Sequence, residues 1–87
     1  MAEYLYMPNL GLTMTEGTIE TWVKSEGDKI EVGEVFVNIE NNKSVEEVES
    51  RSAGVLLKIL VEEGDTVEVG TPIGIIGEAG EDISAML

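Results

Sequence analysis

The chain has 87 residues, of which 43% are hydrophobic, and this length suffices for one packed core and no more. Its 18 acidic and five basic side chains give a formal net charge of −13, which disfavours binding to the phosphates of nucleic acids. The absence of cysteine and histidine excludes disulfides, nucleophile systems built on either residue, and metal sites that need them.

The ends of the chain carry no membrane or export signal that can be recognised. No apolar run approaches the roughly 20 residues of a membrane-spanning helix. The opening MAEYLYMP lacks both the basic start and the long apolar stretch of a signal peptide, and it does not look like a transit peptide. We therefore expect a cytoplasmic protein, as in a bacterium, or an excised domain, without a membrane partner.

Short apolar runs alternate with glycine-containing turns along the chain, and no stretch keeps the 3.6-residue period of a helix. This pattern predicts an all-β fold, either a small sandwich or a flattened barrel. The main strands are expected at Tyr4–Met7, Thr18–Val23, Val35–Glu40, Ser44–Glu49, Val55–Val61 and Pro72–Gly77, with shorter strands near Leu12–Thr13, Lys29–Glu31 and Thr66–Glu68.

An internal repeat covers much of the chain. The segment GTIETWVKSEGDKIEVGEVFVNI from Gly17 aligns without gaps on GVLLKILVEEGDTVEVGTPIGII from Gly54, an offset of 37 residues (54 minus 17). The glycine of each E-G-D suits a tight turn with positive φ. The repeat predicts two halves related by an approximate two-fold axis. We assign the repeated glycines to turns rather than to phosphate binding: Gly17, Gly27, Gly33, Gly54, Gly64 and Gly70.

The segment that joins the two halves, VFVNIENNKSVEEVES from Val35, carries a lone lysine, Lys43. The two asparagines before it favour a tight turn, which places Lys43 at the tip of a hairpin. At the offset of 37, position 43 corresponds to Tyr6 and Gly80, which lie near the chain ends. An approximate two-fold axis then predicts that this turn projects from the end opposite both termini. An exposed lysine usually stays only solvated, but a hairpin tip also gives an acylating enzyme access to the amine.

Other features have ordinary structural interpretations. The acids Glu46, Glu47 and Glu49 are expected to solvate a strand and guard its edge against pairing. Met7 and Met14 are expected to fill the core. The tail GEAGEDISAML breaks the alternation of the strands, so we expect one domain over residues 1–78 and the start of a flexible linker over residues 79–87.

From Tyr4 to about Gly77 the sequence resembles the lipoyl domains of 2-oxo acid dehydrogenase complexes. The stretch MPNLGLTMTEGTIETWVKSEGDKIEVGE looks like the family pattern M-P-x-L-x-x-x-M-x-x-G-x-I-x-x-W-x-x-x-E-G-D-x-I-x-x-G, in a form similar to domains of pyruvate- or acetoin-type complexes. The resemblance implies a flattened barrel of two quasi-symmetric four-stranded sheets. The matching residues are Met7, Pro8, Leu10, Met14, Gly17, Ile19, Trp22, Glu26, Gly27, Asp28, Ile30 and Gly33.

The attachment motif of that family, E-[TS]-D-K-[AS], reads Glu40-Asn41-Asn42-Lys43-Ser44 in this chain. The resemblance implies that lipoic acid is attached covalently to Lys43, within a recognition turn that includes Glu40, Asn42 and Ser44. Asn42 stands where the family has aspartate, which keeps the turn shape and removes one negative charge.

A second site is implied by resemblance to the loop that family members present to the decarboxylase. As a plain loop it would only cap one end of the barrel, and both interpretations stay open. Its residues are Asn9, Leu10, Gly11, Leu12, Thr13, Met14, Thr15 and Glu16.

The resemblance implies a carrier that performs no catalysis alone, within a parent dihydrolipoyllysine-residue acyltransferase. Its partners would be a lipoate-attaching enzyme, a thiamine-dependent 2-oxo acid decarboxylase, the acyltransferase core and dihydrolipoyl dehydrogenase. A tethered arm on a tethered domain raises the effective concentration at each active site. The isolated domain is expected to be monomeric.

Three alternatives remain. A biotinyl carrier domain shares this fold, although such domains typically carry methionines on both sides of the modified lysine, whereas Lys43 lies between Asn42 and Ser44. An unmodified β-sandwich that serves only as an interaction module is a second alternative. A hydrolase that uses paired carboxylates such as Glu46 and Glu49 is the third, and no insertion supplies a cleft for it.

Overall fold

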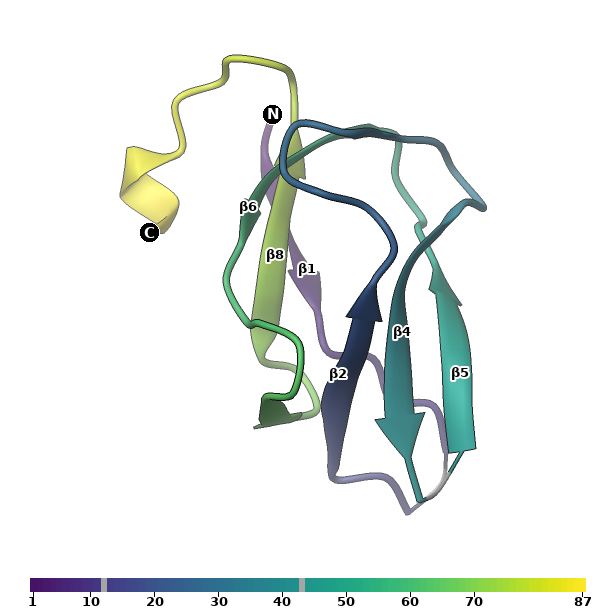
Figure 1. Cartoon of the computed structure of the whole chain (residues 1–87). Helices are drawn as coiled ribbons and strands as arrows, with labels where there is room; N and C mark the ends of the chain where they lie inside the picture. Colours follow the sequence, from purple (N-terminus) through teal and green to yellow (C-terminus); the bar gives the residue numbers. More distant parts are fainter. Residues whose placement is uncertain (12, 43) are drawn as a thin grey trace.

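The computed structural model describes residues 1–11, 13–42 and 44–87, which form two antiparallel sheets packed face to face (Figure 1). Sheet A has four strands in the order β1–β8–β6–β3, and sheet B has four in the order β5–β4–β2–β7. The predicted all-β fold of two four-stranded sheets is confirmed. The elements are β1 (Glu3–Tyr6), β2 (Glu16–Trp22), β3 (Lys29–Ile30), β4 (Val35–Asn41), β5 (Ser44–Glu49), β6 (Gly54–Ile59), β7 (Thr66–Glu68), β8 (Pro72–Gly77) and the 3₁₀ turn η1 (Ser84–Met86).

The six main strands form where they were expected, with ends that shift by at most two residues. The short strand expected near Leu12–Thr13 is wrong at Thr13, which lies in a turn, and Leu12 lies outside the described residues. This turn forms because the backbone N–H of Met14 donates to the carbonyl oxygen of Gly11 over 3.1 Å. Within the described ranges, no helix is long and apolar enough to cross a membrane.

The two halves of the repeat interlock, because each sheet takes two strands from each half. The first half, β1–β4, supplies β1 and β3 to sheet A and β2 and β4 to sheet B. The E-G-D turns hold the halves together: the N–H of Gly27 donates to the carbonyl of Leu56 over 2.7 Å, and that of Gly64 donates to Ile19 over 2.8 Å. Both glycines have the positive φ that the sequence predicts, 96° and 92°.

The glutamates of the two E-G-D turns also form hydrogen bonds to the opposite half of the chain. The Glu26 side chain accepts the backbone N–H of Ile59 over 2.8 Å, and the Glu63 side chain accepts that of Trp22 over 2.8 Å. The Trp22 indole N–H then donates to the carbonyl of Val61 over 2.8 Å. These bonds satisfy donors at the ends of β2 and β6 that no strand neighbour would otherwise reach.

One part of the symmetry differs from the prediction. In β1, Tyr6 pairs with Pro72, and in β5, Glu49 pairs with Val35. Since Pro72 is the counterpart of Val35 at the offset of 37, Tyr6 corresponds to Glu49 at an offset of 43 (49 minus 6). The expected match of position 43 with Tyr6 is therefore wrong. The turn between β4 and β5 nevertheless lies at the end of the molecule opposite the N-terminus and the end of β8 (Figure 1).

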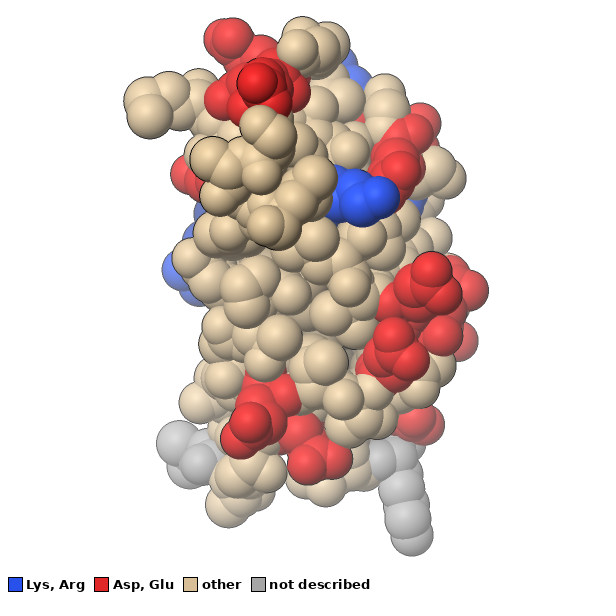
Figure 2. All heavy atoms as spheres, turned by 90° about the vertical axis from the view of Figure 1, so that its left-hand side faces the viewer, with Lys and Arg blue, Asp and Glu red and all other residues tan. Residues whose placement is uncertain are grey.

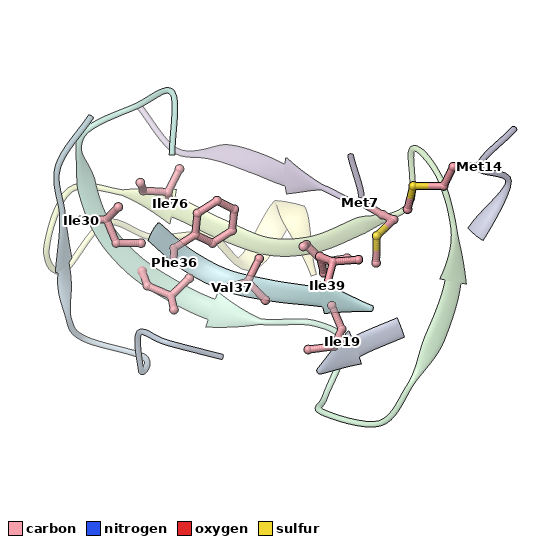
Figure 3. Packing of buried hydrophobic residues seen from close by; sticks show 10 residues of the cluster. Met7, Met14, Ile19, Ile30, Phe36, Val37, Ile39 and Ile76 are labelled. Atoms are coloured by element: carbon pink, nitrogen blue, oxygen red, sulfur yellow. The ribbon is translucent and has the colours of Figure 1, made fainter. Parts of the chain in front are cut away.

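The core between the sheets is built mainly from isoleucine, as the scarcity of aromatic residues requires. Met7 and Met14 lie in it, 1% and 7% exposed, which confirms their expected role (Figure 3). Figure 3 shows them at one end of the core and Ile30 toward the other. The buried cluster comprises Met7, Met14, Ile19, Ile30, Phe36, Val37, Ile39, Leu56, Ile73 and Ile76.

The assignment of Gly17 and Gly54 to turns is wrong, because they lie in β2 and β6. A β-carbon on Gly54 would lie 2.8 Å from the carbonyl oxygen of Gly77, and one on Gly17 would lie 2.8 Å from Cε of Met14. Both positions therefore need glycine for close packing rather than for a reversal of the chain.

The reciprocal carboxylates allow a matched test. Glu63→Ala is expected to lower the free energy of unfolding by about 1 kcal/mol relative to Glu62→Ala, because the Glu63 side chain accepts the backbone N–H of Trp22 and the structure shows no such bond to the Glu62 side chain within the described ranges. Both changes remove one negative charge, so their difference isolates the hydrogen bond. Urea unfolding followed by Trp22 fluorescence measures it. Equal stability of the two variants would contradict the role of this bond.

Candidate functional site

The turn that joins the halves is a tight hairpin between β4 and β5. Asn41 pairs with Ser44, which leaves two residues as the connection. Asn42 has a φ of 49°, the only positive φ of a non-glycine residue within the described ranges. Asparagine tolerates this left-handed region better than other residues with a side chain, and positive φ is typical of two-residue hairpins. The doublet of asparagines thus explains the turn.

The predicted attachment residue, Lys43, lies outside the described residues, so the structure places its neighbours. Glu40 ends the regular part of β4 and is exposed, as are Asn42 and Ser44. Two strands anchor the turn on either side through the pairs Glu40 with Val45 and Asn41 with Ser44. The turn is therefore an accessible tip on a regular support.

The strand that follows the turn is an acidic edge. Glu46, Glu47 and Glu49 are exposed on β5, the outermost strand of sheet B, as the sequence predicts. Glu46 pairs with the buried Ile39, so its side chain projects from the core-facing side of the sheet at the open edge. A charge in that place prevents another strand from pairing there.

The loop between β1 and β2 contains a large departure from two-fold symmetry. The chain takes eleven steps from Tyr6 to Gly17 (17 minus 6) and only five from Glu49 to Gly54 (54 minus 49), so the first half has six additional residues here. These residues fall within the predicted partner loop. The repeat in the sequence could not locate them, since its ungapped part begins only at Gly17.

The partner loop is fixed to the core on both sides of its tip. The backbone N–H of Leu10 meets Sδ of Met14 at 3.1 Å, and both side chains pack on the core. The N–H of Gly11 donates to Oδ1 of Asn9 over 3.2 Å. The loop thus caps one end of the barrel through Met14, while Asn9, Gly11, Thr13, Thr15 and Glu16 remain exposed. Leu12 lies outside the described residues.

The loop and the hairpin turn meet at the same end of the molecule (Figure 1). A β-carbon built on Gly11 would lie 3.9 Å from Nδ2 of Asn41, although thirty positions separate them (41 minus 11). A hollow of about 230 Å³ adjoins the turn, and Oγ1 of Thr18 lies 2.7 Å from Oγ1 of Thr66 there. It is lined by Glu16, Gly17, Thr18, Glu40, Asn41, Asn42 and Thr66.

Sequence reasoning missed the two threonines of this hollow. Thr18 pairs with both Glu40 and Thr66, so three strands bring the groups together. The only signal in the sequence was the outward alternation of β2, which does not reveal that β7 is its neighbour. Within the described part of the chain, no group of three or more acidic side chains is arranged to hold a metal ion.

Residues 3–76 match the family model of biotin and lipoyl attachment domains, described as biotin-requiring enzyme. The chain belongs to this biotin/lipoyl family. Over 88% of its length it superposes on a lipoyl domain of the 2-oxoglutarate dehydrogenase complex of Azotobacter vinelandii, with 35% identity, a TM-score of 0.70 and 98% of that domain covered. The resemblance of the sequence to lipoyl domains is thereby confirmed.

Curated relatives come from complexes of two kinds. The acetyltransferase component of the pyruvate dehydrogenase complex of Zymomonas mobilis is 46% identical over 90% of this chain and 18% of its own length. The succinyltransferase component of the 2-oxoglutarate dehydrogenase complex of Staphylococcus saprophyticus is 49% identical over 83% of this chain and 17% of its own length. The chain thus spans less than a fifth of these relatives.

The same fold occurs in a carboxylase. Urea carboxylase of Kluyveromyces lactis superposes over 88% of this chain with a TM-score of 0.72 and 31% identity, and the match covers 6% of that enzyme. The fold alone therefore does not separate lipoyl from biotinyl carriers, and the residues of the turn must do so.

The geometry of Asn42 predicts how the turn tolerates substitution. Asn42→Val is expected to lower the free energy of unfolding by about 1–2 kcal/mol, because a β-branched residue is strained at a positive φ. Asn42→Gly is the control and should stay within about 0.5 kcal/mol of the parent. Thermal and urea unfolding measure both. A valine variant as stable as the glycine variant would show that the turn does not hold this φ.

Proposed function

We propose that this domain is the lipoyl carrier of an acyltransferase component of a 2-oxo acid dehydrogenase complex, with lipoic acid joined to Lys43 through an amide bond. The observation that carries the proposal is the motif Glu40 to Ser44 on a two-residue hairpin at the end opposite the start of β1. The whole-domain match to a lipoyl domain supports the choice of cofactor.

When bound, the lipoyl group supplies a cyclic disulfide that takes up an acyl group together with two electrons. The partners would be a thiamine-dependent 2-oxo acid decarboxylase, the acyltransferase core and dihydrolipoyl dehydrogenase, after a lipoate-attaching enzyme has modified Lys43. The pyruvate and 2-oxoglutarate complexes named among the relatives support this set of partners as a class.

The chain itself contributes position and access. The paired ends of β4 and β5 hold the backbone on both sides of the turn, so an enzyme that approaches it meets a regular support formed by Glu40, Asn41 and Ser44. The tip of the partner loop lies beside Asn41, so an enzyme that reaches the turn also meets the loop. We therefore assign recognition to the two segments together rather than to the turn alone.

A biotinyl carrier is the second candidate, and the structural match to urea carboxylase favours it. The match covers only a small part of that enzyme, and Asn42 and Ser44 stand where biotinyl domains typically carry methionine. An unmodified interaction module is the third candidate, and it applies if neither lipoic acid nor biotin is attached to the domain.

Intact-mass measurement tests the attachment. The protein from cells with active lipoylation is expected to gain one lipoyl increment, and Lys43→Ala should abolish it. Lys29→Ala is the matched control, because its side chain is 75% exposed and lies in a different strand. A biotin increment would establish the second candidate, and an unmodified chain in a competent host would leave the interaction module.

The residue before the lysine gives a separate prediction. Asn42→Asp should preserve or increase the rate of lipoylation in vitro, because it restores the family's acid and keeps the turn shape. The initial rate with purified lipoate ligase measures the effect, and circular dichroism controls for folding. Loss of modification in a folded variant would show that the ligase does not read this position as the family pattern implies.

A further inference from the structure

The two sheets have the same backbone arrangement and very different outer faces. The outer face of sheet B carries the polar residues Glu20 of β2, Asn38 and Glu40 of β4, and Glu47 of β5, together with the exposed Val45 of β5, which pairs with Glu40. The counterparts of the four polar residues in sheet A are Leu57, Ile75, Gly77 and Tyr4, by offsets of 37 for the first three and 43 between Tyr4 and Glu47.

The register shows that these sheet A residues share one face, on which Lys58 also lies because it pairs with Ile75. Tyr4 pairs directly with Ile75, and a β-carbon on Gly77 would lie 2.9 Å from Cδ1 of Leu57. Ile75 is 0% exposed although it lies outside the cluster that fills the space between the sheets. Something other than sheet B therefore covers it.

The chain that follows β8 supplies the cover. It turns back beside β1 and β8 and ends in η1 (Figure 1). The hydroxyl of Tyr4 donates to the carbonyl oxygen of Met86 over 2.8 Å, which brings η1 to Tyr4, the partner of Ile75 in the sheet. Ile83 and Met86 are partly buried. The side of the molecule that carries this segment has a broad uncharged area, with acidic and basic side chains around it (Figure 2).

A second contact fixes the start of the segment. The Glu81 carboxylate accepts the backbone N–H of Glu78 over 3.0 Å and that of Ala2 over 2.6 Å. These bonds, that from Glu78 first, lower the pKa of Glu81, so it is charged at neutral pH. A β-carbon on Gly77 would lie 2.7 Å from Oε1 of Glu81, so the glycine makes room for this carboxylate.

We propose that residues 78–86 form a strap that belongs to the folded domain, covers the apolar outer face of sheet A and ties down the edge strand β1. Without the strap, that face and the open edge of β1 would associate with a second copy of the chain. The strap therefore keeps the domain monomeric, and a flexible linker in any longer chain begins after it rather than at residue 79. This proposal is independent of what Lys43 carries.

Backbone dynamics of the 87-residue chain give the first test. Heteronuclear ¹⁵N NOE values of residues 78–86 are expected to equal those of the strands. Tyr4→Phe removes only the hydroxyl that holds Met86, so it should speed amide exchange in residues 83–86 and leave β4 unchanged. Low or negative NOE values over residues 78–86 in the parent chain would overturn the strap.

Shortening the chain gives the second test. A chain that ends at Gly77 is expected to melt at least about 5 °C lower and to self-associate in sedimentation velocity. Adding Tyr4→Glu and Ile75→Asn, the residues at the equivalent positions of sheet B, should restore the monomer. A shortened chain that melts with the parent and stays monomeric would refute the proposal. If it does not fold at all, the NOE and exchange measurements on the full chain decide.

Discussion

Reciprocal hydrogen bonds between the two E-G-D turns and the opposite half of the chain hold this domain together. Gly27 donates to Leu56, and Gly64 donates to Ile19, both of which are fully buried in the core. Each turn therefore needs a strand that lies 29 or 45 positions away (56 minus 27, 64 minus 19). Neither half can bury its apolar residues alone, because every sheet contains strands of both. The repeat is consequently one cooperative unit rather than two linked modules.

This interlocking also determines where a site can be displayed. The turn between β4 and β5 is the short passage from one half to the other, and two residues suffice for it because the strands are neighbours in sheet B. The equivalent connection in sheet A would join β8 to β1, which are neighbours but are the last and first strands of the chain. The six additional residues between β1 and β2 lie at the same end of the molecule as the β4–β5 turn, with Gly11 beside Asn41. The additional loop and the hairpin thus lie together at the end that carries the motif.

Much of this was predictable because the signals were local. The positive φ of Gly27 and Gly64 follows from E-G-D, and the hairpin follows from two asparagines between apolar runs. Gly17 and Gly54 were wrongly assigned to turns because the sequence alone does not distinguish a glycine needed for close packing from a glycine needed for a turn. The equivalence of β1 and β5 cannot be recognised from the sequence, because equivalent positions carry dissimilar residues such as Tyr4 and Glu47. The pairing of Thr18 with Thr66 joins two strands that are far apart in the chain. Pairing between strands far apart in the chain requires the fold.

The contrast between Tyr4 and Glu47 has its own physical meaning. On a symmetric backbone, equivalent outward positions meet the same local sterics, so a difference in polarity reflects what covers them. The outer face of sheet B carries the partly buried Asn38 and the exposed Glu40, whereas that of sheet A carries the buried Ile75 and Gly77, and Glu81 of the proposed strap lies beside Gly77. Comparison of the two halves across the approximate two-fold axis therefore identifies the features that only one half has. These are the additional loop beside the hairpin and the apolar outer face beneath the tail.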